Sequence, residues 1–193
     1  MPWEKAFDED VIVGRAMDVF WEKGYEPASM ADLLVATGIT RGSLYNAFGG
    51  KEALFFKTLE KYDAENRRAM LAELEAIDDP LRAMTLLFDS VVAETLADPL
   101  KRGCFLVNTA ADLATHGEPV RALVRNGMRE LEAFFRRCIE VGLARGQIPP
   151  AIEPATTAKG LMGLLVSIRV LGRGVFDEAS LNTLAAQAQR LLR

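Results

Sequence analysis

Cysteine and histidine are scarce in this chain of 193 residues, which holds Cys104, Cys138 and His116 and no others of either type. Two cysteines do not make the disulfide framework of a small secreted domain, so a reducing cytoplasm is the simplest setting. The three residues are far apart in the sequence, and they show no spacing typical of a metal site. We therefore expect neither a metal ion nor another cofactor.

Membrane spans, secretion signals and catalytic motifs are also missing. Hydrophobic residues make up 50% of the chain, yet no uninterrupted run reaches the roughly 18 apolar residues of a membrane helix. The opening MPWEKAFDED is acidic and lacks the basic and then apolar pattern of a secretion signal; we expect its Trp3 to be loose or packed on the first helix. No glycine-rich phosphate loop occurs and no nucleophile has an evident base, so we predict that the chain is not an enzyme.

The chain does have regular helical patterning. Apolar residues recur every three or four positions between breaks at Gly, Pro and Asp, which predicts an all-α protein of about nine helices. The expected helices span residues 8–23, 29–37, 40–48, 51–76, 80–96, 103–115, 120–144, 154–172 and 178–192. A chain of 193 residues can bury a sizeable hydrophobic core and is long enough for one or two domains.

Residues 29–51 predict a helix-turn-helix motif. Ser29 and Thr40 are good N-caps for two short helices, and Gly38 between them can take the left-handed conformation of a helix C-cap. In such a motif the second helix enters the major groove of DNA. The alternative is an ordinary surface helix in a helical hairpin.

The outward side chains of the second short helix are suited to reading DNA. Arg41 can donate to guanine or phosphate, Asn46 can pair with adenine, and Gly42 allows a close approach. Lys51, at the start of the next helix, is placed for a phosphate, or is simply a solvated lysine. The candidate DNA-binding residues are Ser29, Met30, Thr40, Arg41, Gly42, Ser43, Tyr45, Asn46 and Lys51.

The charge balance argues against a nonspecific DNA coat. The net charge is −4, and acidic side chains outnumber basic ones in the first fifty residues, whereas such a coat would be basic. The acids cluster before and along the first helix, and none lies between Asp32 and Glu52. We therefore expect sequence-specific binding with a modest salt dependence.

The runs GITRGSLYNAFGGKEALF (38–55) and FWEKGYEPASMADLL (20–34) resemble the signature of TetR-family bacterial transcriptional regulators. The resemblance implies a three-helix helix-turn-helix DNA-binding domain at 1–50 and a helical bundle at 51–193 that binds a small-molecule effector and dimerises. It implies a cytoplasmic, ligand-responsive repressor that binds double-stranded, pseudo-palindromic operator DNA as a homodimer. Leu34, where such turns often carry Ala, and Asn46, where an aromatic or His is common, depart from the family pattern.

The expected helix at 103–115 mixes polar residues into an apolar sequence, as the wall of a ligand cavity does; a buried helix with satisfied polar groups is the alternative. Our candidate effector-binding residues are Phe88, Cys104, Phe105, Asn108, Met128, Phe135, Met162 and Leu165.

Two residues of the effector region have a second interpretation each. Cys104 opens a helix after Lys101 and Arg102, which favours a thiolate, and RGCFLVNTA resembles the segment that carries a reactive cysteine in some TetR-like regulators. The alternative is a buried small hydrophobic residue. Arg169 could anchor an anionic effector, but we favour an ion pair with a nearby acid.

The last two helices, at about 154–192, have more apolar surface than one core can bury. Gly160, Gly163 and Ser167 leave room for another helix, which indicates a subunit interface. By resemblance, a second copy would complete a four-helix bundle there. The rival overall interpretation is a helical ligand-binding or protein-interaction module without specific DNA binding.

Overall fold

The computed structural model describes residues 7–193, so Trp3 lies outside the described residues. The elements are α1 Glu9–Lys23, α2 Met30–Thr37, α3 Arg41–Phe48, α4 Lys51–Tyr62, η1 Asp63–Arg68, α5 Ala69–Glu75, α6 Pro80–Ala97, α7 Phe105–Ala111, η2 Leu113–Thr115, α8 Glu118–Ala144, α9 Pro154–Leu171 and α10 Glu178–Arg190. Over 7–193 there is no strand, which confirms the all-α prediction. Helix α4, the turn η1 and helix α5 are continuous and form one rod, the α4 rod (residues 51–75). With this rod counted once, residues 7–193 contain nine α-helical segments, the number that the sequence predicts.

Helix starts follow the predicted caps. The Ser29 hydroxyl accepts from the Asp32 amide at 3.1 Å, and the Asp32 carboxylate accepts from the Ser29 amide at 2.9 Å, which is a capping box. Gly38 then ends α2 at φ 72°, a left-handed conformation that costs glycine little. Local side-chain chemistry is therefore enough to set the limits of the motif.

The single long helix predicted from Lys51 to about Ala76 is interrupted by the π-helical turn η1. Two buried ions lie in this turn: the Arg67 Nε donates to Asp63 Oδ1 at 2.5 Å, and the Arg67 Nη1 donates to Glu130 Oε2 of α8 at 2.7 Å. A π turn is uncommon and is often found at functional positions. Here it accompanies a cross-link between the α4 rod and α8 that no local pattern reveals.

The helix predicted at 103–115 is shorter than expected. Residues 98–104 form a loop in which Lys101 and Gly103 have φ of 53° and 71°, and the Asp98 carboxylate accepts from the Arg102 amide at 2.6 Å. A Cβ on Gly103 would lie 2.9 Å from the Arg173 Cδ, so the loop is pressed against the end of α9. Helix α7 consequently starts only at Phe105, and Asp112 separates it from the 3-10 turn η2.

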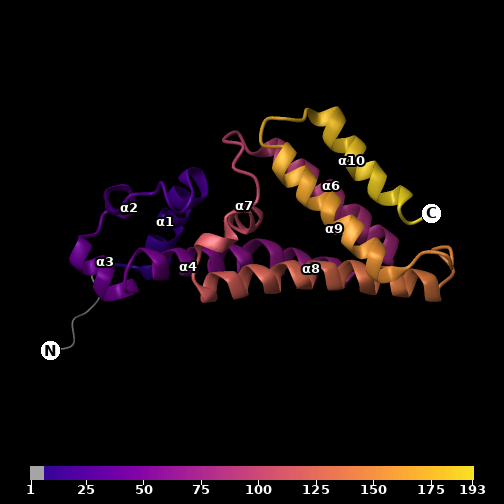
Figure 1. Ribbon diagram of the computed structural model, residues 1–193, viewed down its shortest axis with the longest axis horizontal. Helices are drawn as coiled ribbons and strands as arrows, with labels where there is room; N and C mark the ends of the chain where they lie inside the picture. The colour runs from indigo at the N-terminus through magenta and orange to yellow at the C-terminus, as the bar shows by residue number, and fades with distance from the viewer. Residues whose placement is uncertain (1–6) are drawn as a thin grey trace.

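Two hydrophobic cores lie along the molecule (Figure 1). Helices α1–α3 are at one end, the α4 rod and α8 run lengthwise, and α6, α9 and α10 pack at the other end. The N-terminal core contains Ile12, Val13, Ala16, Phe20, Ala28, Leu33, Leu44, Phe48, Leu54, Phe55, Leu59, Tyr62, Phe105, Leu106, Val120 and Val124. Because its last four members come from α7 and α8, this core joins α1–α3 to the rest of the chain.

Candidate functional site

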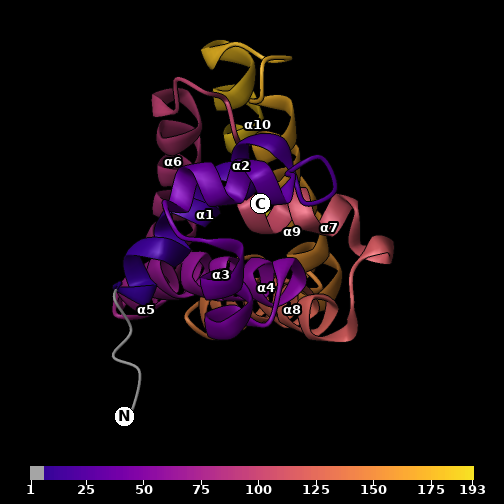
Figure 2. The ribbon, with the colours of Figure 1, turned by 90° about the vertical axis from the view of Figure 1, so that its left-hand side faces the viewer.

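Helix α3 lies at the outer end of the molecule with one face in solvent (Figure 2). Leu44 and Phe48 face the core, while Arg41, Tyr45 and Asn46 are exposed. The Thr40 hydroxyl accepts from the Ser43 amide at 3.2 Å and lies 3.0 Å from the Ser43 hydroxyl. The exposed face therefore carries a guanidinium, a phenol and an amide on a helix whose first turn is fixed by its cap.

The candidate DNA-binding residues lie together at this end of the molecule. Thr40, Gly42 and Ser29 are exposed, and Ser43, Met30 and Lys51 are partly buried at the starts of α3, α2 and α4. The three helix N-termini hold free amides that suit phosphate oxygens. Whether each residue contacts DNA stays a prediction.

Several acids of the first helices are neutralised by bases. Asp32 pairs with Lys23 at 2.6 Å, and the hydrogen bonds from Lys23 and Ser29 lower the pKa of the Asp32 carboxyl. Asp10 pairs with Lys61 at 2.7 Å and Asp18 with Arg102 at 3.2 Å. Because Lys61 and Arg102 lie outside the first fifty residues, the charge balance of that segment overstates the net negative charge of this end of the molecule.

A cavity of about 290 Å³ lies where the α4 rod, α6, α7, α8 and α9 meet. Its walls combine apolar side chains with a smaller number of polar and charged ones, and are formed by Tyr62, Glu65, Asn66, Arg67, Ala69, Met70, Glu73, Ser90, Val91, Glu94, Cys104, Leu106, Val107, Met128, Leu131, Leu165 and Arg169. This composition is typical of a small-molecule site.

The cavity gathers three of our candidate effector-binding residues, Cys104, Met128 and Leu165. The other candidates lie elsewhere. Phe105 lies in the N-terminal core, Phe135 lies in the C-terminal core that α5, α6, α8, α9 and α10 form, and Met162 packs against that second core. The Asn108 Nδ2 donates to the Arg102 carbonyl at 2.7 Å instead of facing the cavity. Helical spacing alone does not say which apolar side chains leave a gap between them.

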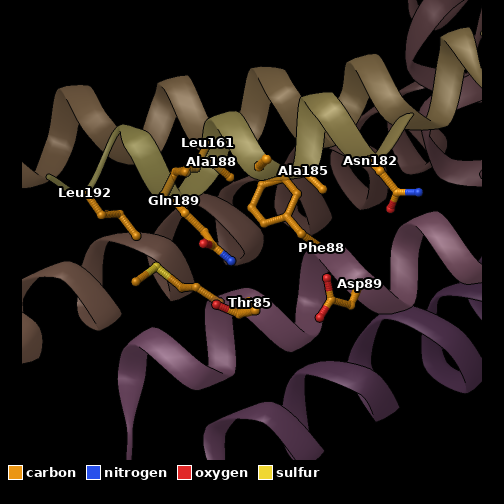
Figure 3. A pocket seen from close by; sticks show the side chains of 11 residues that line it. Thr85, Phe88, Asp89, Leu161, Asn182, Ala185, Ala188, Gln189 and Leu192 are labelled. Atoms are coloured by element: carbon orange, nitrogen blue, oxygen red, sulfur yellow. The ribbon is translucent and has the colours of Figure 1, made fainter. Parts of the chain in front are cut away.

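Phe88 lines a separate cleft of about 150 Å³ between α6 and α10 (Figure 3). Thr85 and Asp89 of α6 face Asn182 and Gln189 of α10 across it, with the Phe88 ring between them. The sequence reasoning also missed cavity residues on the α4 rod, among them Tyr62 and Met70. The buried Asp63–Arg67 pair, four residues apart, was the available signal for that region.

Cys104 and Arg169 both line the larger cavity. Cys104 is the half-buried N-cap of α7, and burial first, then the neighbouring Cys104, raises the pKa of Tyr62. The Arg169 Nη2 donates to Glu94 Oε2 at 2.5 Å, so the expected ion pair is present. Its positive charge is thereby largely neutralised.

One face of α9 is open. A Cβ on Gly163 would meet no atom within 4 Å, and Val170, on the same face, is 46% exposed. Against α10 the fit is closer, since a Cβ on Gly160 would lie 3.3 Å from the Leu191 Cδ1. Within residues 7–193, no helix is long and apolar enough to cross a membrane.

Comparisons with known proteins agree with this arrangement. Residues 12–58 match the family described as "Bacterial regulatory proteins, tetR family", and residues 80–187 match "Tetracyclin repressor-like, C-terminal domain". The HTH-type transcriptional repressor ComR of Escherichia coli K12 is 29% identical over 98% of this chain and 89% of its own length. The uncharacterised HTH-type regulator YezE of Bacillus subtilis is 33% identical over 68% of each chain.

A solved structure of a TetR-family protein is also similar to this chain. The TetR family transcriptional regulator CifR, as a cysteine mutant complexed with 26-bp double-strand operator DNA, has a TM-score of 0.85 and 30% identity, covering 99% of this chain and 100% of that chain. The agreement extends over both ends of the molecule. The chain therefore belongs to the TetR family of bacterial regulatory proteins.

Proposed function

We propose that this protein is a transcriptional repressor that binds operator DNA through α3 and acts where bacterial DNA lies, in the cytoplasm. The exposed Arg41, Tyr45 and Asn46 on a capped helix are the observation that carries the proposal. Relatives named as repressors, and the CifR complex with operator DNA, support it. No reaction is part of this function, and we propose no catalytic residue.

We propose a homodimer in which α9 and α10 of two copies form a four-helix bundle. The open face at Gly163 and Val170 supports it, because a helix of a second copy can approach a glycine closely. Two-fold symmetry would set the two α3 helices about 34 Å apart, one turn of DNA, for a pseudo-palindromic site.

We also propose a division of labour along the chain, with residues 1–50 contacting DNA and 51–193 binding effector and partner. The α4 rod belongs to both parts, since its first turns pack in the N-terminal core and its later turns line the cavity. A small molecule in the cavity would therefore press on the helix that leads to α3. Effector binding would favour a spacing of the two α3 helices that no longer fits the operator.

The direct experiment is binding to the protein's own upstream intergenic DNA, followed by fluorescence anisotropy at two salt concentrations. We expect tight binding that survives competitor DNA and weakens with salt. Weak binding that decreases equally on any DNA as the salt concentration rises would favour a helical module without specific DNA recognition.

Substitutions then test the contacts. Arg41→Ala should weaken operator binding by about 1–3 kcal/mol and relax the sequence preference, whereas Lys51→Ala should mainly reduce the salt dependence. Arg136→Ala is the control, because Arg136 is an exposed arginine of α8, away from α3. Unchanged affinity in Arg41→Ala and Tyr45→Ala would contradict the assigned interface.

A further inference from the structure

The chain's sole histidine lies in the N-terminal core, at the turn between η2 and α8. His116 is 7% exposed. Its ring stacks on Phe55 of α4 with centroids 5.0 Å apart and an interplanar angle of 2°. The Tyr25 ring, from the connection between α1 and α2, lies 5.1 Å away. This imidazole thus contacts the helices at the DNA end from the effector side of the molecule.

Tyr25 connects this stack to a candidate DNA contact. The Lys51 Nζ lies 4.5 Å from the centroid of the Tyr25 ring and donates to the Glu26 carbonyl at 3.3 Å. Lys51 begins α4 directly after the Gly49–Gly50 turn that ends α3. A shift of His116 would therefore be transmitted through a single ring to the start of α4.

The site accommodates a neutral imidazole better than a charged one. The buried His116 Nδ1 has no hydrogen-bond partner among the described residues. Burial lowers the pKa of His116 below 6.5, and the carboxylates of Asp112, Glu26 and Glu52 offset this only in part. Protonation would add a second N–H and a charge between aromatic rings, in a site that is largely shielded from water.

We propose that His116 is a positioning residue for operator binding: its neutral ring docks the effector domain onto the DNA-binding helices, and its protonation releases them. This inference rests on the proposed function. A histidine that docks in its neutral form contributes fully above its free pKa of about 6.5. The contribution is lost as the pH falls from there through the lower pKa of the docked state. Released DNA-binding helices would sample more orientations and bind the operator more weakly.

The test compares operator affinity between about pH 5.5 and 8, the range in which histidine titrates. We expect the dissociation constant of the wild type to rise about fivefold or more toward acid pH, the lower end of typical coupling. His116→Phe keeps a flat ring and cannot take a proton. Its affinity should therefore match that of the wild type at neutral pH, and its dissociation constant should not show this rise at acid pH. His116→Ala should bind weakly at every pH.

Ile139→Val is the control, since Ile139 is buried in the C-terminal core and its substitution should leave the pH profile unchanged. An identical pH dependence in wild type and His116→Phe would overturn the proposal. The same conclusion would follow if His116→Ala bound as tightly as the wild type at neutral pH.

Proton NMR of the full-length protein gives a reading that needs no DNA. The chain has one histidine, so one imidazole Cε1–H signal reports on it. We expect that signal to be shifted upfield by the Phe55 ring, and to titrate with a midpoint below 6.5 as the stack is lost. Operator binding with an unshifted, normally titrating histidine would refute the docking role. The shifted signal without any operator binding would instead refute the proposed function.

Discussion

Buried charges are the side chains whose replacement should cost most. Arg67 is 6% exposed and Asp63 1% exposed, and Arg67 also reaches Glu130. Arg67→Ala should lower the free energy of unfolding by about 3 kcal/mol, because it removes one partner of a buried pair. Denaturant unfolding followed by circular dichroism measures this loss.

The neighbouring arginine is a matched control. Arg68 pairs with the same Asp63 at 2.9 Å but is 56% exposed, so Arg68→Ala should cost less than about 1 kcal/mol. If the two variants lost equal free energy of unfolding, the burial of Arg67 would add nothing to what this side chain contributes to stability.

The two cysteines should differ sharply toward a thiol reagent near neutral pH. Burial raises the pKa of the Cys138 thiol to about 11, whereas Cys104 is half-buried and borders the cavity. Since the thiolate is the reactive form, we expect one thiol to react in the folded protein and both in denaturant. A folded protein in which neither reacts would exclude Cys104 as a sensor thiol.

Helix α8 depends on one glycine for its contact with the α4 rod. A Cβ on Gly127 would lie 2.8 Å from the Leu106 Cδ2 and 3.1 Å from the Arg67 Nε. Gly127→Ala should therefore destabilise the protein by about 1–3 kcal/mol through overpacking, despite the better helix propensity of alanine. Thermal unfolding of the purified variant measures the change.

Gly163 of α9 provides the opposite case, because a Cβ there meets open space. Gly163→Ala should stabilise an isolated subunit by up to about 1 kcal/mol. If both variants were stabilised, helix propensity, and not the approach of α8 to the α4 rod, would decide the effect of Gly127→Ala.

Assembly should depend on the open face of α9. In Gly163→Arg, the new side chain meets no atom of its own subunit within 4 Å of its Cβ, yet it would hold a second helix away. We expect this variant to keep its circular dichroism spectrum and to elute as a monomer, with the mass measured by light scattering. It should also lose most of its operator affinity, since one half-site alone remains bound.

Gly14→Arg is the matched control for assembly. Gly14 also lies in a helix, α1, with nothing within 4 Å of an added Cβ. This variant should keep the mass of a dimer. A dimeric Gly163→Arg protein would place the subunit interface elsewhere.

Local chemistry decided the helices and the motif. Ser29, Gly38 and Thr40 act within a few residues of themselves, so the sequence already predicted the limits of α2 and α3. The outward face of α3 followed from helical periodicity, because Leu44 and Phe48 must point inward. The ion pair of Arg169 was also expected, since a buried guanidinium needs an acid.

Tertiary packing decided what depends on distant residues. The π turn at Asp63–Arg68 accompanies a cross-link to Glu130 on α8, and the loop before α7 is pressed against α9 at Arg173. The cavity beside the α4 rod arises where five elements fail to fill a common space, which no single helix encodes. The burial of His116 on Phe55 likewise joins two residues that are far apart in the sequence, so only the folded chain shows that its one histidine lies between the N-terminal helices and the rest of the molecule.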